Sequence, residues 1–291
     1  MPEPLVTVAM SVHNGAGTLG SAIRSILWQT FSDWELVLVN DASTDETEEI
    51  LRHFRDSRIR VIDERQQKGL ATRLNQSVDQ ARGKYVARMD ADDIAYPERF
   101  ERQVEYLEGH PDLDLLGHGA VLFKGDGEVL GVYPTACDHD EICRRPWWGF
   151  PLAHPTWMGK RSWFVRHRYD SNLTKGQDQE LLLRTYRTSR FAGLPDILLG
   201  YRVERISMSK SFRGRFSYCL ALVSQVHNAS SAIALARGVG LHTLGLGRDV
   251  ALGLQGDASR TSRQSIRGAN DAITGQWQAV WDRLKEPTCD S

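Results

Sequence analysis

The sequence predicts an α/β fold with a mainly parallel central sheet, followed by a helical region. Apolar, β-branched runs alternate four times with amphipathic helical patterns between residues 5 and 90. This order is typical of parallel strands joined by right-handed crossovers, with helices on both faces of the sheet. The alternation has ended by residue 209, and a helical pattern runs from about residue 214 to 286. We therefore expect two parts, residues 1–210 and residues 211–291.

The elements of the first part follow from where apolar residues recur. Buried strands are expected where apolar runs end at polar residues, at 5–12, 34–39, 59–62 and 85–90. The helices between them each carry one apolar face, over 19–27, 45–54 and 70–81. Thr18 and Asp45 suit the starts of the first two helices, and Gly83 suits the stop of the third.

The pattern changes after Asp93. A helix with Phe100, Val104 and Leu107 on one face is expected to lead into two paired strands. The later segments are the strands 113–123 and 129–133, an aromatic stretch at 146–151, a helix near 161–168 and another that begins close to Asp178. A carboxylate at that last helix start suits either an N-cap or a general base.

The composition is that of a soluble globular enzyme and excludes several classes of protein. The chain has 36 Lys and Arg against 37 Asp and Glu, so no global field would recruit nucleic acid. Its four cysteines form no metal or disulfide pattern, and we expect free thiols in a reducing cytosol. The sequence contains no run of eighteen apolar residues, so we expect no transmembrane helix. The N-terminus does not have the pattern of a secretory signal.

Three carboxylates, Asp90, Asp92 and Asp93, directly follow a buried strand. Carboxylates this close repel one another, which favours a bound cation, and hard oxygen ligands favour Mg²⁺ or Mn²⁺. Because Mg²⁺ usually sits on one or two carboxylates plus substrate phosphates, the cluster indicates a nucleotide. The alternative is an acidic turn that caps the helix opened by Pro97. His13 and Asp41 follow two other strands, and parallel strands would bring all three clusters to one edge of the sheet.

The chain resembles the family 2 glycosyltransferases, inverting enzymes of the GT-A fold that use nucleotide sugars. Residues 5 to about 209 carry the resemblance, and the C-terminal eighty residues do not. Five landmarks occur in the family's order: Ser11-Val12-His13-Asn14, Val39-Asn40-Asp41-Ala42-Ser43-Thr44-Asp45, Gly69 to Asn75 with Gly83, Met89-Asp90-Ala91-Asp92-Asp93, and His154-Pro155-Thr156 followed by Gln177-Asp178.

The resemblance implies a role for each landmark. Asp178 would be the catalytic base, Asp92 and Asp90 would hold Mn²⁺ or Mg²⁺, and Asp41 would read the nucleotide base. The nucleotide pocket would comprise Ser11, Val12, His13, Asn14, Asp41, Lys68, Arg73, Asp90 and Ala91. Lys68 and Arg73 would add charge-assisted bonds to the diphosphate. The groups near the acceptor or the phosphates would be His154, Trp148 and Arg202.

Some positions depart from the family pattern. Asn40 replaces the first of the usual two aspartates, Ala42 replaces a glycine, and Gln177 replaces the glutamate beside the base. Glu204 stands where a histidine is common, so Arg202 and Ser207 are alternatives for closing over the phosphates.

These landmarks favour an inverting, metal-dependent transferase that uses a UDP-sugar in polysaccharide or glycoconjugate synthesis. A catalytically degenerate nucleotide-binding scaffold is one alternative. A nucleotidyltransferase is another, although Gly15-Ala16-Gly17 lacks the basic partner of a phosphate loop. The acceptor would be a saccharide or a lipid-linked sugar. We expect a cytoplasmic protein that can also bind peripherally to the inner face of the membrane. Its C-terminal helices are expected to form a homodimer, to dock on a membrane or to hold the acceptor.

Overall fold

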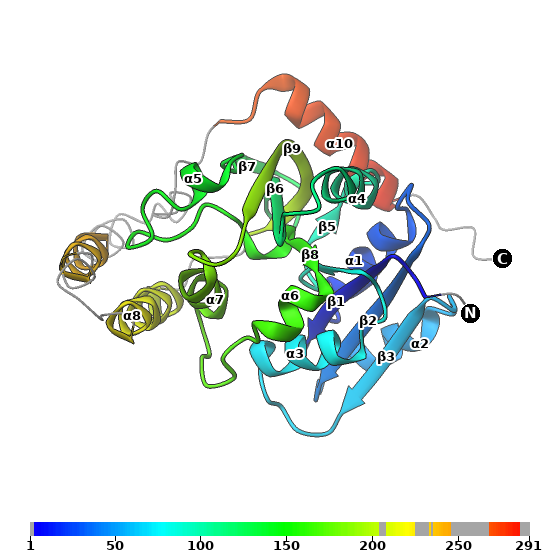
Figure 1. Ribbon diagram of the computed structural model, residues 1–291. Helices are drawn as coiled ribbons and strands as arrows, with labels where there is room; N and C mark the ends of the chain where they lie inside the picture. The colour runs from blue at the N-terminus through cyan, green and yellow to red at the C-terminus, as the bar shows by residue number, and fades with distance from the viewer. Residues whose placement is uncertain (1–2, 204–207, 225–232, 234, 246–267, 286–291) are drawn as a thin grey trace.

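The computed structural model describes residues 3–203, 208–224, 233, 235–245 and 268–285. Within these residues one sheet of nine strands runs through the molecule, with helices on both faces (Figure 1). The first half consists of β1 (Val6–Val12), α1 (Leu19–Leu27), β2 (Trp34–Asp41), α2 (Thr47–His53), β3 (Ile59–Glu64), α3 (Leu70–Gln80), β4 (Tyr85–Arg88), β5 (Ile94–Ala95) and α4 (Arg99–Gly109).

The second half adds further strands and helices to the same sheet. It consists of β6 (Leu115–Phe123), β7 (Val129–Tyr133), α5 (His139–Ile142), the 3₁₀ turn η1 (His154–Thr156), β8 (Met158–Lys160), α6 (Arg161–Arg166), α7 (Gln177–Thr185), β9 (Phe191–Arg202), α8 (Met208–Ser224) and α10 (Asp271–Lys285). The predicted α/β fold is confirmed, and helices follow the sheet toward the C-terminus.

The sheet is parallel in its first half and mixed in its second. Strands β3, β2, β1 and β4 lie side by side and parallel, as the alternating pattern predicts. Beyond them β8 pairs antiparallel with β4 and β6, while β9 is parallel to β6. A short turn joins β6 to β7, which requires an antiparallel pair because a parallel one needs a long crossover. The expectation of a mainly parallel sheet therefore holds for β1 to β4, and the rest of the sheet is mixed.

Two cores cover the two faces of the sheet. On one face, α1 and α4 bury residues such as Ile23 and Phe100 against β1 and β2. On the other, α3, α6 and α7 pack with Trp157 and Trp163. Because every residue of β2 is buried, the sheet gives the polar residues at its strand ends a fixed support.

The helix α10 belongs to the body of the molecule. Trp277 is 1% exposed, and its ring lies 4.5 Å from that of Phe123 in β6. Its indole N–H donates to the carbonyl of Gly127 at 2.8 Å. The expected boundary at residue 210 stays a prediction, but α10 shares a core with β5 and β6.

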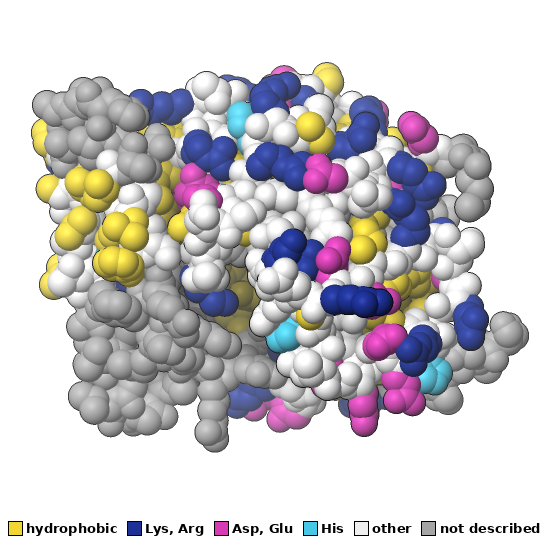
Figure 2. Space-filling view, turned by 90° about the horizontal axis from the view of Figure 1, so that it is seen from below, with side chains coloured by type: hydrophobic (Ala, Val, Ile, Leu, Met, Phe, Trp, Pro, Cys, Tyr) yellow, Lys and Arg dark blue, Asp and Glu magenta, His cyan; other side chains and the backbone are white. Residues whose placement is uncertain are grey.

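The helices α8 and 235–245 leave apolar side chains at the surface. Figure 2 shows hydrophobic side chains gathered at that end of the molecule. The exposed ones include Leu220, Val223, Val239 and Leu244. None of the described helices is both long and apolar enough to cross a bilayer. The expected dimer and membrane contacts stay predictions.

Candidate active site

Three polar segments meet at one edge of the sheet because their strands are parallel neighbours. Strand β1 lies between β2 and β4, and the ends of these strands lead to residues 11–14, Asp41 and residues 90–93. We call residues 90–93 the acidic loop. The hydroxyl of Thr18, at the start of α1, donates to the carbonyl of Ala91 in that loop at 3.1 Å. Thr18 therefore ties α1 to the acidic loop and makes no side-chain cap on its own helix.

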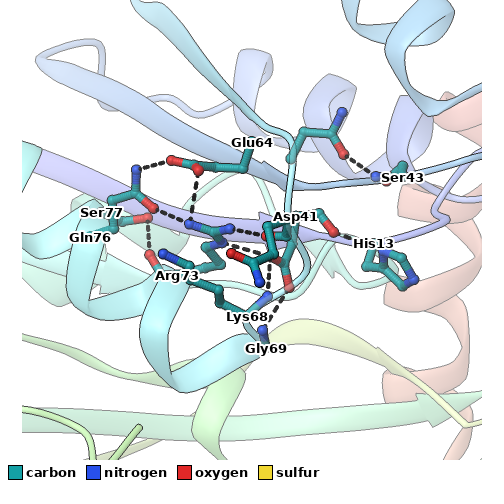
Figure 3. A network of polar contacts seen from close by, with 11 residues as sticks. His13, Asp41, Ser43, Glu64, Lys68, Gly69, Arg73, Gln76 and Ser77 are labelled. Atoms are coloured by element: carbon teal, nitrogen blue, oxygen red, sulfur yellow. Dashed lines mark hydrogen bonds and ion pairs between the residues drawn. The ribbon is translucent and has the colours of Figure 1, made fainter.

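Asp41 lies at the centre of a hydrogen-bond network in which three N–H groups donate to its carboxylate (Figure 3). Its Oδ1 accepts from the backbone N–H of Lys68 at 2.9 Å and from Nε of Arg73 at 2.6 Å. Its Oδ2 accepts from the backbone N–H of Gly69 at 2.8 Å. Burial disfavours the charge on Asp41, but these hydrogen bonds outweigh it and hold the pKa below its usual value. Asp41 is therefore a fixed, ionised acceptor.

The guanidinium of Arg73 is buried and bonds to neighbouring side chains. It is 2% exposed, and Figure 3 shows its guanidinium between Asp41, Glu64 and Gln76. Nη1 donates to Gln76 at 2.9 Å and lies 3.3 Å from Glu64. The expectation that Arg73 binds the diphosphate is therefore replaced by a role in holding Asp41. Lys68 contributes its backbone N–H to Asp41, and its side chain is exposed.

Hydrogen bonds join the loops after β1 and β2, and each loop contains one residue with positive φ. Asn14 and Ala42 both have positive φ, 56° and 57°. The backbone N–H of Asn14 donates to the Ser43 hydroxyl at 2.9 Å, and its side-chain oxygen accepts from the backbone of Thr44 at 2.8 Å. His13 Nδ1 lies 2.9 Å from the carbonyl of Asp41. Ala42 thus occupies the left-handed conformation that suits the family's glycine.

The acidic loop is poorly compensated by comparison. Arg88, at the end of β4 and 3% exposed, grips Asp90 with both terminal nitrogens, one of them at 2.7 Å. Burial and the charge of Asp90 raise the pKa of Asp92 to about 6. Burial and both neighbouring carboxylates raise the pKa of Asp93 well above its usual value. One carboxylate oxygen of Asp93, Oδ2, is buried and has no hydrogen-bond partner within the described part of the chain.

These features fit a divalent cation. One carboxylate oxygen from each of Asp90, Asp92 and Asp93 can be chosen so that all three lie within 4.8 Å of one another. Hard oxygen donors are the ligands that Mn²⁺ and Mg²⁺ accept, and a cation would relieve the repulsion that raises the pKa values. The residues present therefore fit the expected metal.

Arg202, at the end of β9, braces the acidic loop. Its backbone N–H donates to Asp93 at 2.9 Å, and its Nε donates to the carbonyl of Asp92 at 2.8 Å. Its guanidinium lies over the ring of Phe123, 4.7 Å from the ring centroid. The side chain of Arg202 therefore lies beside the acidic loop. Glu204 and Ser207 lie outside the described residues.

The sequence patterns did not single out Tyr169, which contacts His154. His154 is 8% exposed, and its Nε2 lies 2.9 Å from the hydroxyl of Tyr169. Burial, and then the charge of Arg88, lowers the pKa of His154 well below its usual value, so the ring is neutral. Burial raises the pKa of the Tyr169 hydroxyl, and the charges of Asp178 and Asp90 add to this shift against the charge of Arg88, so Tyr169 lies within electrostatic reach of both α7 and the acidic loop.

Asp178 is the second residue of α7, whose N-cap is Gly176. The N-cap interpretation of Asp178 is therefore wrong. Among the described residues no hydrogen bond or ion pair engages its carboxylate, which is partly exposed.

Trp148 is partly covered by the helix 235–245. Its ring stacks on that of His242 with centroids 6.0 Å apart, and it is 37% exposed. The loop that carries it is fixed by Gln179 of α7, whose side-chain oxygen accepts from the backbone N–H of Phe150 at 2.8 Å. This loop and the helix of Asp178 therefore form one unit.

Comparison with known proteins identifies the family. Residues 7–167, more than half of the chain, match the model of glycosyl transferase family 2. The chain belongs to this family. It is 31% identical over 215 residues to the O-antigen biosynthesis glycosyltransferase WbnJ of Escherichia coli, which covers 71% of this chain and 83% of that protein. Family 2 relatives thus include an enzyme of polysaccharide biosynthesis, and the chain is a glycosyltransferase.

Two solved structures share the GT-A fold at low sequence identity. Residues 1–349 of Staphylococcus aureus TarS in complex with UDP superpose with a TM-score of 0.63 at 19% identity, over 81% of this chain and 71% of that one. The mannosyltransferase PcManGT of Pyrobaculum calidifontis, in complex with GDP-Man and Mn²⁺, superposes with a TM-score of 0.60 at 15% identity, over 98% of this chain and 88% of that one. These likenesses show the fold.

Proposed function

We propose that this glycosyltransferase is an inverting, divalent-metal-dependent enzyme that transfers a sugar from a UDP-sugar to a hydroxyl group of a saccharide or lipid-linked acceptor. The observation that carries the proposal is the meeting, at one edge of the sheet, of Asp41 with one acceptor position left and of an acidic loop whose charges are only partly compensated. The first suits a nucleotide base, and the second would suit a divalent cation near a diphosphate. Structures of the same fold contain UDP in one case and GDP-Man with Mn²⁺ in another.

The hydrogen bonds of Asp41 favour uracil as the base. A carboxylate has about four acceptor positions, two on each oxygen. Oδ1 already accepts from Lys68 and Arg73, and Oδ2 accepts from Gly69, so one position remains on Oδ2. The ring N–H of uracil is a single donor and needs one acceptor. Guanine presents two adjacent donors and would need both oxygens, so Asp41 disfavours it.

The residues around the acidic loop would serve the departing diphosphate. Asp92 and Asp90 would hold Mn²⁺ or Mg²⁺, with Asp93 behind them, and Arg202 would reach the phosphate oxygens. A bound divalent cation supplies charge stabilisation to the leaving group. Ser11 to Asn14 would line the nucleotide, because they lie between the two carboxylate sites.

Asp178 would be the base. Its carboxylate takes the proton of the acceptor hydroxyl while that oxygen forms a bond to the anomeric carbon. The bond from that carbon to the phosphate oxygen breaks, and the electron pair leaves with UDP. Attack opposite the leaving group inverts the anomeric configuration. Tyr169, whose hydroxyl pairs with His154, lies within electrostatic reach of both this base and Asp90.

Replacement of Asp178 tests this assignment. We expect Asp178→Asn to reduce turnover by about 10² to 10⁴, the range of a general base, while the Kd of UDP in Mn²⁺ stays unchanged. The assay is release of UDP from UDP-glucose, UDP-galactose and UDP-N-acetylglucosamine, with the anomer of the released sugar read by NMR. Glu180→Gln, on the same helix, is the matched control. Full turnover by the Asn variant, or release of the retained anomer, would contradict the proposal.

A further inference from the structure

Two chain segments of the active site separate just beyond the end of a strand pair. Strands β4 and β8 pair up to Ala87 and Met158, and one more bond joins the Arg88 N–H to the Trp157 carbonyl at 2.8 Å. From there one chain enters the acidic loop, and the other leads back into η1. That turn carries His154 and, through it, the contact to Tyr169. The backbone ladder does not extend between these two segments.

Buried side chains from α4 close this fork. Arg99, the first residue of α4 and fully buried, donates from one terminal nitrogen to the carbonyl of Arg88 at 2.8 Å and to that of Pro155 at 2.9 Å. Its Nε donates to the side chain of Gln103 at 3.1 Å. Gln103, also fully buried, donates to the carbonyl of Thr156 at 2.9 Å. Arg99 and Gln103 therefore contact both segments at once.

The arrangement is costly as a device for stability alone. Burial, opposed by the attraction of Asp93 and aided by the positive charge of Arg88, lowers the pKa of Arg99 to about 9. Its Nη1 is buried and has no hydrogen-bond partner among the residues that the structure describes. An apolar side chain would fill the same core without desolvating a charge. A planar guanidinium, however, can hold two carbonyls and an amide in one fixed geometry.

We propose that Arg99, supported by Gln103, is a positioning residue that fixes the acidic loop relative to the His154 turn. It thereby sets the distance between the leaving-group side of the active site and the pair of His154 and Tyr169, which lies within electrostatic reach of Asp178. The inference rests on the proposed function for the identity of those two sides. Among the described residues, the hydrogen bonds of Arg99 go to backbone carbonyls and to Gln103, so we place its action on the protein backbone and not on the substrate.

The test compares Arg99→Met with a matched control on the same helix. Arg102→Met removes an exposed arginine whose partners are Glu105 and Asp196. Hydrogen exchange of the metal-free protein is followed in peptides that cover residues 88–93 and 153–158. We expect faster exchange in both peptides for Arg99→Met and no change for Arg102→Met. Unchanged exchange in both peptides would overturn the proposal.

A second readout separates positioning from general stability. Among the described residues the hydrogen bonds of Arg99 reach neither β1 nor β2, which carry the proposed base-binding groups. We therefore expect the Kd of UDP in Mn²⁺ to change less than turnover does, by no more than about threefold. Turnover of the UDP-sugar that the wild-type protein hydrolyses should fall about 100-fold, the usual cost of misplacing reacting groups by an ångström. A purely structural role would lower the melting temperature and leave turnover of the folded protein intact. Turnover within twofold of the wild-type value in folded protein would contradict the proposal.

Two more variants keep the test decisive if Arg99→Met does not fold. Arg99→Lys keeps the charge but cannot hold both carbonyls and Gln103, and we expect at least a tenfold loss of turnover. Gln103→Met leaves both carbonyl bonds of Arg99 and should lose about fivefold. Wild-type turnover in both would overturn the inference. Asp92→Ala reports on the proposed metal site separately, because the exchange experiment uses no metal.

Discussion

Asp41 and the acidic loop both follow parallel strands of the same sheet, yet their surroundings are opposite. Asp41 accepts hydrogen bonds from three N–H groups, and its pKa is held low. The acidic loop holds three carboxylates, of which Asp90 alone is bonded by the bidentate Arg88. An oxygen of Asp93 has no hydrogen-bond partner among the described residues, and the pKa values of Asp92 and Asp93 are raised. A nearly full set of hydrogen bonds suits a rigid acceptor, and incomplete compensation suits a site that a cation completes.

The largest expected contrast is in stability. Asp41→Asn leaves the buried guanidinium of Arg73 without its main counter-charge and sets an amide against three N–H donors, so we expect a loss of about 3 kcal/mol. Asp92→Asn removes a repelled carboxylate and should stabilise the metal-free protein at pH 7 by about 1–3 kcal/mol. Urea unfolding measures both. The comparison breaks if the two variants change the free energy of unfolding in the same direction.

The same contrast appears in the pH dependence of stability. The folded pKa of Asp92, about 6, lies above its ordinary value of 3.8, so its favourable contribution is present below that value and is lost as the pH rises through about 6. The pKa of Asp41 is lowered, so its contribution is present above its unfolded pKa and is lost as the pH falls through the folded one.

Unfolding of Asp92→Asn and wild-type protein from pH 4 to 8 isolates the Asp92 effect. We expect the two free energies to agree near pH 4 and to diverge as the pH rises. Binding of Mn²⁺ needs ionised Asp92 and should weaken below about pH 6. A difference that is constant over the whole range would show that Asp92 is not destabilised in the folded protein.

A smaller effect is expected at the loop beside Asp41. Ala42 has φ 57°, which costs an alanine about 1 kcal/mol relative to glycine. Ala42→Gly should therefore raise the free energy of unfolding by about 0.5–1 kcal/mol. Ala16→Gly is the control, because Ala16 is not among the residues with positive φ and the change should destabilise slightly. Equal effects of the two substitutions would show that Ala42 is not strained.

The sequence predicted the positions of the carboxylates better than their surroundings. Asp41 and Asp92 could be found because a strand pattern fixes which residues reach the carboxyl edge of a parallel sheet. The burial of Arg73 against Asp41 and the grip of Arg88 on Asp90 depend on packing that no local pattern encodes. Arg99 and Pro155 are 56 residues apart in the sequence. The spacing of apolar residues that predicts the helix near Arg99 therefore gave no sign of this contact.

The hairpin of β6 and β7 was predicted, but the antiparallel pairing of β8 with β4 and β6 was missed for a related reason. The alternation of strands and helices that predicts parallel pairing stops after β4, and β8 is only three residues long. Such a short strand has no pattern that distinguishes it from a loop. Tyr169 was missed because a single tyrosine after a helix has no signal until Asn75 and His154 are seen to hold it.

The most direct test of the contrast is calorimetric titration of UDP, GDP and dTDP with and without Mn²⁺, on wild-type protein and on Asp92→Ala. We predict that UDP binds in the presence of Mn²⁺, that GDP binds more weakly, and that Asp92→Ala loses the metal-dependent binding. UDP binding that is equally strong without metal, or that survives in Asp92→Ala, would contradict the assignment of the acidic loop as the cation site.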